Sequence, residues 1–138
     1  MDTLNFNING YEKSEIGIEN NDFQWCNIYL NFKNKIINYE VNSDILQITE
    51  LKKINEGLKK CLSGELMEDK LIYFDEPDIE IYLHHNIVDK SHRVELRLIM
   101  DLDGYCDDYY SVFLYDKEIN MLRDYINDFL ESINQKAI

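Results

Sequence analysis

The chain has 138 residues, with 14 Lys and Arg against 27 Asp and Glu, so its net charge is −13. Such acidity argues against a nucleic-acid binder, which needs a basic surface to neutralise phosphates, and against docking on anionic lipid. The hydrophobic fraction of 45% is enough to build a core. The length predicts a single domain, with residues 1–22 as an N-terminal strand arm and residues 23–134 as its core.

The N-terminal residues show no basic segment followed by an apolar one, and no apolar run is long enough to span a membrane. The three cysteines, Cys26, Cys61 and Cys106, are widely spaced and form no CxxC pair. An odd, dispersed set of this kind is typical of reduced thiols. We therefore expect a cytoplasmic protein.

The first third of the chain alternates apolar and polar residues, as half-buried strands do. Residues 4–8 alternate Leu, Phe and Ile with Asn, and the Asn9-Gly10 pair that follows predicts a tight turn, with a return strand over residues 11–18. A cleaner alternation over residues 25–32, a short turn and a second run over residues 37–41 predict a β-hairpin.

A helix is predicted over residues 51–62, because its apolar residues recur every three or four positions. Thr49 is the expected N-cap and Gly64 the expected C-terminal stop. Gly57 lies inside this helix, where glycine costs about 1 kcal/mol relative to alanine. Its presence suggests a close approach to a sheet.

The rest of the chain predicts four strands and a second helix. The helix should begin at an Asp116 N-cap and carry an apolar stripe that ends at Ile133. An Asp103-Gly104 turn should join the last two strands. The expected strands cover residues 70–75, 79–84, 93–102 and 109–115. The predicted fold is α+β, an antiparallel sheet of about six to eight strands with two amphipathic helices packed on one face.

Metal-ligand patterns are weak. The run Asp101–Gly104 resembles the middle of a calcium loop, but Ile99 and Tyr110 occupy the first and last ligand positions. His85, Asp89 and His92 are spaced as zinc ligands could be, although surface histidines on neighbouring strands explain the spacing more simply. We therefore expect no metal and no cofactor.

Catalytic motifs are also weak. The sequence contains no GxSxG elbow, P-loop or dinucleotide fingerprint. Glu80 and Glu95 could serve as an acid–base pair, but close pairs arise by chance among so many acids. We expect no catalytic residues.

Tyrosines next to acidic residues are the most distinctive surface feature. Tyrosine is enriched at protein interfaces, and acids steer a basic partner towards them. Acidic residues gather at 75–80 and at 101–108, and the second group runs into tyrosines. The residues expected to bind a partner are Tyr105, Asp107, Asp108, Tyr109, Glu80 and Glu95.

The pattern over residues 25–134 resembles the WapI-type bacterial immunity proteins and their uncharacterised relatives. The similarity runs from Trp25 on a strand, through the helix closed by Ser63-Gly64-Glu65, to the strand that leads into Asp116 and the last helix. The resemblance implies a small cytoplasmic protein that binds and neutralises the toxic domain of a polymorphic toxin. It implies no catalytic residues.

The sequence thus predicts a non-enzymatic immunity-type protein that occludes a cognate, basic toxin domain. One alternative is a cytoplasmic accessory domain whose acidity serves only solubility. Another is a small metal-dependent hydrolase built on His85, Asp89 and His92. The exposed Asn-rich first strand could also pair with a second copy of the chain, as edge strands do.

Overall fold

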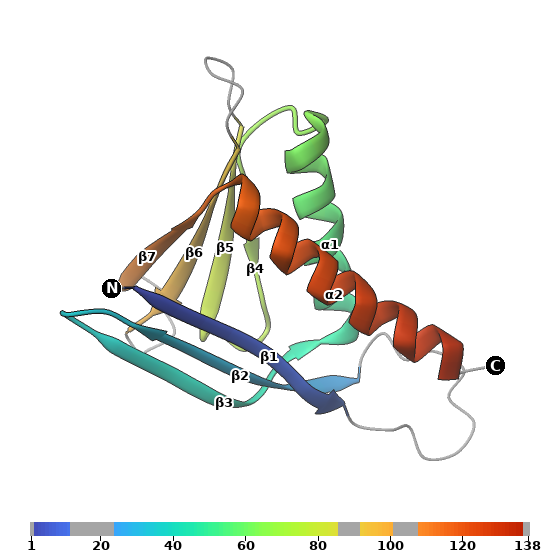
Figure 1. Ribbon diagram of the computed structural model, residues 1–138, viewed down its shortest axis with the longest axis horizontal. Helices are drawn as coiled ribbons and strands as arrows, with labels where there is room; N and C mark the ends of the chain where they lie inside the picture. Colours follow the sequence, from blue (N-terminus) through green and yellow to red (C-terminus); the bar gives the residue numbers. More distant parts are fainter. Residues whose placement is uncertain (1, 12–23, 86–91, 101–107, 137–138) are drawn as a thin grey trace. The chain divides into compact units, whose positions relative to one another are not determined.

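The computed structural model describes residues 2–11, 24–85, 92–100 and 108–136. The chain divides into two compact units, Met1–Glu50 and Leu51–Ile138. The predicted α+β class is confirmed, because the described residues form antiparallel strands and two helices. The seven described strands agree with the expected number, but they form a three-stranded and a four-stranded sheet (Figure 1).

The first unit contains β1 (Thr3–Tyr11), β2 (Trp25–Lys33) and β3 (Asn38–Gln47), in the order β1-β2-β3. Both pairings are antiparallel, so the predicted β2–β3 hairpin is confirmed and β1 joins the same sheet. Alternate residues of β2 point to opposite faces. One of these faces is buried and carries Cys26, Ile28, Leu30 and Phe32.

The tight turn predicted at Asn9-Gly10 is wrong. Both residues lie inside β1, and the pairing with β2 shifts between Ile8 and Gly10. This shift is a β-bulge, in which one strand accommodates an extra residue without reversing direction. The predicted return strand begins at Tyr11, the last residue of β1, and otherwise falls outside the described residues.

Helix α1 (Ile48–Ser63) begins earlier than predicted, so Thr49 lies inside it. The side chain that serves its N-terminus belongs to Glu50, whose Oε1 accepts a hydrogen bond from the backbone N–H of Gln47 at 2.8 Å. An acidic side chain that reaches back across the first turn is half of a capping box.

The predicted stop at Gly64 is confirmed. Gly64 has a φ of +81°, a conformation that side chains with a Cβ disfavour. The backbone N–H groups of Glu65 and Leu66 both bond to the carbonyl of Lys60, at 3.1 and 3.3 Å. This is the hydrogen-bond pattern of a glycine-terminated helix.

The second unit contains a four-stranded antiparallel sheet in the order β4-β5-β6-β7. Every second residue along its strands faces the core, as Ile81 and Leu96 do. Helix α2 (Asp116–Lys136) follows β7 and contacts β6 and β7. The strands are β4 (Lys70–Tyr73), β5 (Ile79–His84), β6 (Arg93–Ile99) and β7 (Tyr109–Leu114).

Asp116 begins α2 as predicted, but its side chain is not bonded as an N-cap. Its Oδ1 accepts hydrogen bonds from the backbone N–H of His92 at 2.9 Å and lies 3.1 Å from His92 Nδ1. The first turn is closed by the carbonyl of Tyr115, which accepts from the N–H of Ile119 at 2.8 Å. Asp116 therefore ties α2 to the start of β6.

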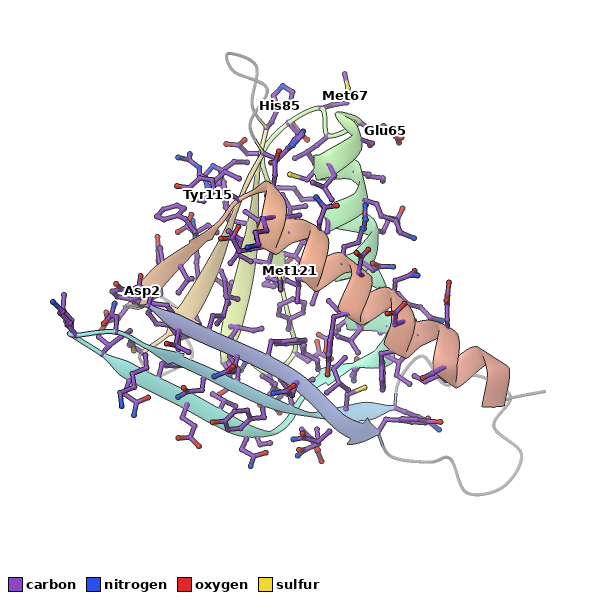
Figure 2. The ribbon with its side chains drawn as sticks, in the orientation of Figure 1. Asp2, Glu65, Met67, His85, Tyr115 and Met121 are labelled. Carbon is purple, nitrogen blue, oxygen red and sulfur yellow. The ribbon has the colours of Figure 1, made fainter. Side chains whose placement is uncertain are left out.

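Large exposed hydrophobic side chains are concentrated in the second unit. Among the described residues, the first unit has one such residue, Ile36 in the β2–β3 turn. Those of the second unit include Met67, Tyr115 and Met121, whose positions are labelled in Figure 2.

Gly57 provides a test of the helix–sheet packing. A Cβ at this position would lie 2.8 Å from Leu83 Cδ1 and 3.2 Å from Ile72 Cδ1. Leu83 is completely buried, so its side chain has little room to move. Gly57→Ala should gain about 1 kcal/mol of helix propensity but lose about 2 kcal/mol through overpacking. Urea unfolding should show a net destabilisation of about 1 kcal/mol.

The second substitution Leu83→Val removes the clashing methyl group. In a double-mutant cycle, Gly57→Ala should therefore cost less in the Leu83→Val background than in the wild type. A stabilisation by Gly57→Ala alone would contradict the close approach.

Candidate functional site: the polar face and acidic end of the four-stranded sheet

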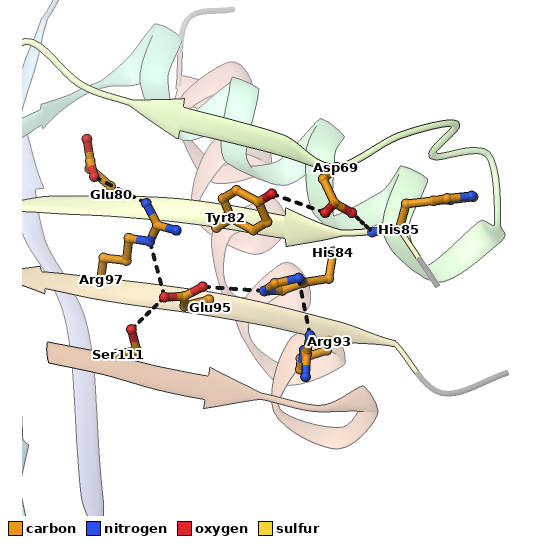
Figure 3. Close-up of polar contacts among 9 residues, drawn as sticks. All are labelled: Asp69, Glu80, Tyr82, His84, His85, Arg93, Glu95, Arg97 and Ser111. Carbon is orange, nitrogen blue, oxygen red and sulfur yellow. Dashed lines mark hydrogen bonds and ion pairs between the residues drawn. The ribbon is translucent and has the colours of Figure 1, made fainter. Parts of the chain in front are cut away.

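The face of the four-stranded sheet opposite the helices carries a network of polar side chains (Figure 3). The strand register places Glu80, Arg97 and Ser111 in one row across β5, β6 and β7. The adjacent row pairs Tyr82 with Glu95. Both helices lie behind the sheet in this view, which agrees with the prediction that they pack on one face.

Arg97 is the centre of the network. Its Nε donates to Glu95 Oε1 at 3.1 Å, and its Nη1 lies 3.9 Å from Glu80 Oε1. The guanidinium carbon lies 4.8 Å from the ring centroid of Tyr82 and 4.6 Å from that of Tyr109. Only 18% of the Arg97 side chain is exposed. Two carboxylates and two aromatic rings therefore replace the water that would hydrate this cation.

Glu95 is held as a carboxylate. Burial pushes its pKa up, but hydrogen bonds from Ser111 Oγ and Arg97, and the charge of Arg97, outweigh burial and leave the pKa below its ordinary value. Its second oxygen lies 3.4 Å from His84 Nε2. Glu95 thus connects β5, β6 and β7 through side chains.

A second set of contacts fixes the far end of β5. Asp69 Oδ1 accepts from the backbone N–H of His85 at 2.6 Å, and its Oδ2 accepts from the Tyr82 hydroxyl at 3.1 Å. The bond from His85 lowers the pKa of Asp69, and the bond to Asp69 raises the pKa of Tyr82. Tyr82 is thereby held at its hydroxyl while its ring stacks on Arg97.

The contacts run in the order Ser111, Glu95, His84. In a hydrolytic triad the imidazole stands between the hydroxyl and the carboxylate, so that it can remove the proton from the nucleophile. Here the carboxylate takes the middle position, and its lowered pKa makes it a weak base. The arrangement suits the fixing of side chains better than proton transfer.

The acids of residues 75–78 and the start of β7 lie at the same end of this sheet. The backbone N–H of Ile99 bonds to the carbonyl of Asp78 at 3.0 Å, and that of Met100 bonds to the carbonyl of Asp108 at 2.8 Å. Burial raises the pKa of Asp78. Tyr73 is 73% exposed and Tyr109 39% exposed. We call this surface the acidic end, and it comprises Asp75, Glu76, Asp78, Asp108, Tyr73 and Tyr109.

The structure brings together four of the six residues predicted to bind a partner. Asp108 and Tyr109 belong to the acidic end, and Tyr109 stacks on Arg97. Glu80 and Glu95 lie in the network and are 8% and 7% exposed, so they support the surface more than they form it. Tyr105 and Asp107 fall outside the described residues, as does the Asp103-Gly104 turn.

Sequence reasoning missed Arg97. The alternation placed Arg97 on the same face as Glu95, and Glu80 was placed on the polar face of the neighbouring strand. Two acids and one base on the same face of neighbouring strands indicate an ion pair. Choosing the right partners needed the register, which shows Glu80 opposite Arg97.

The proposed metal ligands are partly described. His85 bonds through its backbone to Asp69, and His92 contacts Asp116, while Asp89 falls outside the described residues. Within the described part of the chain, no three His, Cys, Asp or Glu side chains gather as metal ligands. Cys26 and Cys61 are buried, and burial raises the pKa of both thiols, to about 12 for Cys26.

Comparisons with protein-family models, curated proteins and solved structures found no match to this chain. The similarity to WapI-type immunity proteins therefore stays a prediction from the sequence pattern. Within the described residues, no helix has both the length and the apolar composition to cross a membrane.

The lowered pKa of Glu95 makes its stabilising effect depend on pH. A carboxyl group whose pKa is depressed in the folded state stabilises the fold above its unfolded pKa of about 4.3, and this stabilisation is lost as the pH falls through the folded pKa. Glu95→Gln should lower the free energy of unfolding by about 1–3 kcal/mol at neutral pH. The difference from the wild type should shrink as the pH falls from about 5 to about 3.

Glu118→Gln is the matched control, because Glu118 is an exposed acid in the first turn of α2. It should change the free energy of unfolding by less than about 0.5 kcal/mol. If Glu95→Gln were as stable as the wild type at neutral pH, Glu95 would not hold the network together.

Proposed function

We propose that this chain is a non-enzymatic, immunity-type protein that neutralises a bacterial toxin, and that its acidic end occludes a basic surface of the cognate toxin domain. The observation that carries the proposal is that four acidic residues and two exposed tyrosines lie at the same end of one sheet. Occlusion requires no chemistry from the inhibitor, only a surface that fits the active site of the toxin and outcompetes its substrate.

The charge of the acidic end favours a basic partner. A net charge of −13 speeds association with a positively charged surface and slows association with polyanions. A toxin that acts on nucleic acid has a basic substrate-binding surface, because its substrate carries phosphates. Carboxylates at the acidic end can replace those phosphates.

The tyrosines of the acidic end can contribute binding affinity that its exposed carboxylates do not. Exposed charges at the rim of an interface contribute mainly to the rate of association, whereas buried aromatic anchors contribute most of the affinity. Tyr73 and Tyr109 are exposed enough to insert into a partner. Phe113, 45% exposed with the Arg93 guanidinium 5.5 Å from its ring centroid, extends this surface along β7.

The network beneath the acidic end prepares it for binding. Tyr109 stacks on Arg97, and Arg97 is held by Glu80 and Glu95. A side chain that is fixed before binding loses less conformational entropy in the complex. Glu80 and Glu95 therefore act by positioning Arg97, and direct contact of either one with a partner stays a prediction.

The test starts from the genes beside this one, where a cognate toxin is expected to be encoded. Co-expression of this chain should restore growth to cells that produce the toxin, and the purified pair should form a complex. Glu76→Lys with Asp108→Lys should weaken that complex by at least about thirtyfold, chiefly through slower association at low salt. Tyr109→Ala should weaken it by a similar factor, chiefly through faster dissociation.

Glu118→Lys with Asp128→Lys is the control, because it makes the same change in net charge on α2. It should alter the dissociation constant by less than about threefold. Neither complex nor rescue with the wild-type chain would overturn the proposed function. Equal weakening by both charge reversals would show that net charge, and not the acidic end, drives binding.

A further inference from the structure

The three-stranded sheet of the first unit has an exposed face that is rich in asparagine side chains. In β2, Asn27, Tyr29 and Asn31 alternate with the buried residues and so point to the opposite face. The strand register places side chains of β1 and β3 next to them. We call this surface the amide face, and it comprises Asn5, Asn7, Asn9, Asn27, Tyr29, Asn31, Asn38 and Asn42.

The concentration of asparagine is specific to this sheet. Every asparagine in β1, β2 and β3 belongs to the amide face, whereas β4, β5, β6 and β7 contain none. Asparagine is depleted in strands, because its side chain competes for backbone hydrogen bonds. If asparagine were simply common throughout the chain, it should also occur in the strands of the second sheet. A residue type that is unfavourable in its secondary structure suggests that the residue is kept there for a function.

Tyr29 lies at the centre of the amide face. It is directly opposite Asn7 on β1 and Asn42 on β3. Asn27 and Asn31 are its neighbours on the same face of β2, two residues away in each direction. One half-buried aromatic ring is thus surrounded by amides on all four sides, at the spacings that a sheet imposes, about 5 Å across strands and about 7 Å along them.

Some of the amides are held by one another. Asn9 Nδ2 donates to Asn27 Oδ1 at 2.9 Å, and Asn27 Nδ2 donates to Asp44 Oδ1 at 3.2 Å. Asn31 Nδ2 donates to Asn38 Oδ1 at 2.9 Å. These bonds orient the amides around Tyr29 before any ligand arrives.

Other amides remain available. The side chains of Asn5, Asn7 and Asn42 make no hydrogen bond to another residue that the structure describes, and all three are exposed. Each amide offers two donors and an acceptor with two lone pairs. The two amides opposite Tyr29 are therefore free to bond a ligand that lies over its ring.

These groups fit a ligand that is uncharged and rich in hydroxyl groups. A hydroxyl both donates and accepts a hydrogen bond, as an amide does, and the C–H face of a sugar ring can stack on an aromatic ring. Tyr29 and its amide neighbours on β1 and β2 carry no charge, and on the same face of β3 the acids Glu40 and Asp44 flank Asn42. A protein partner would need apolar anchors, and the exposed Ile36 of this unit lies in a turn.

We propose that the amide face binds a neutral glycan, with Tyr29 as the stacking platform and Asn7 and Asn42 as hydrogen-bonding partners of the sugar hydroxyls. This site belongs to the first unit, whereas the acidic end belongs to the second. It does not rest on the proposed toxin-neutralising function.

The test is a titration of the full ¹⁵N-labelled chain with cellohexaose, maltohexaose, xylohexaose and chitohexaose, followed by NMR. At least one should shift the side-chain NH₂ signals of Asn7 and Asn42 in a saturable manner, with a dissociation constant below about 10 mM. Asn7→Ala with Asn42→Ala should weaken binding at least about tenfold, and Tyr29→Ala should do the same. The asparagine variants change only exposed side chains, so the test stands even if Tyr29→Ala disturbs the sheet.

Tyr115→Ala is the matched control, since it removes an exposed tyrosine from the second unit, and it should leave glycan binding unchanged. Absence of a saturable shift with all four hexasaccharides would overturn the proposal. So would binding that survives loss of both asparagines. Shifts of the same amides by the toxin domain, and by no hexasaccharide, would reassign the amide face to a protein partner.

Discussion

The constraint on which the second unit depends is the charge of Arg97. Its side chain lies on a sheet face, 18% exposed, between the carboxylates of Glu80 and Glu95 and the rings of Tyr82 and Tyr109. A partly buried cation without counter-charges would destabilise the fold, so β5 and β7 must present these partners in one register. A shift of one residue in the strand register would move the side chains of these partners to the apolar face. The same contacts fix Tyr109, which belongs to the acidic end, so the stability of the sheet and the shape of the proposed binding surface have one cause.

Much of the fold could be predicted, because hydrophobic periodicity is a local property. Alternation located the strands, and the spacing of leucine and isoleucine located both helices. The predictions that were wrong concern sequence patterns that more than one local structure satisfies. Asn9-Gly10 fits a turn and a bulge equally well, and the bulge follows from pairing with β2. Thr49 was a good N-cap by residue type, but the bond from the backbone N–H of Gln47 is accepted by Glu50, in the first turn of α1. Alternation also could not tell that the strands divide into two sheets, because it does not identify the partner of an edge strand.

The candidate site was less predictable, because its residues meet through pairing across strands. Residue type indicated that acids beside tyrosines form a surface, and Asp108 and Tyr109 agree with that expectation. The charge of Glu80 and Glu95 predicts a role in partner binding, whereas both side chains lie against Arg97 and hold it in place. The amide face was visible in the sequence only as alternating asparagines. The ring of amides around Tyr29 emerged once β1 and β3 were placed on either side of β2.

Arg97→Lys tests the central claim most directly, because lysine keeps the charge but loses the planar group that stacks on two tyrosines and reaches two carboxylates. The measurement is the affinity of this variant for the cognate toxin domain of the proposed function, with Arg123→Lys on α2 as the control. If Arg97 organises the acidic end, Arg97→Lys should keep the circular dichroism spectrum of the wild type and bind at least about tenfold more weakly, while the control binds normally. Wild-type affinity in a folded Arg97→Lys variant would contradict the account, because the binding surface would then be independent of the network beneath it.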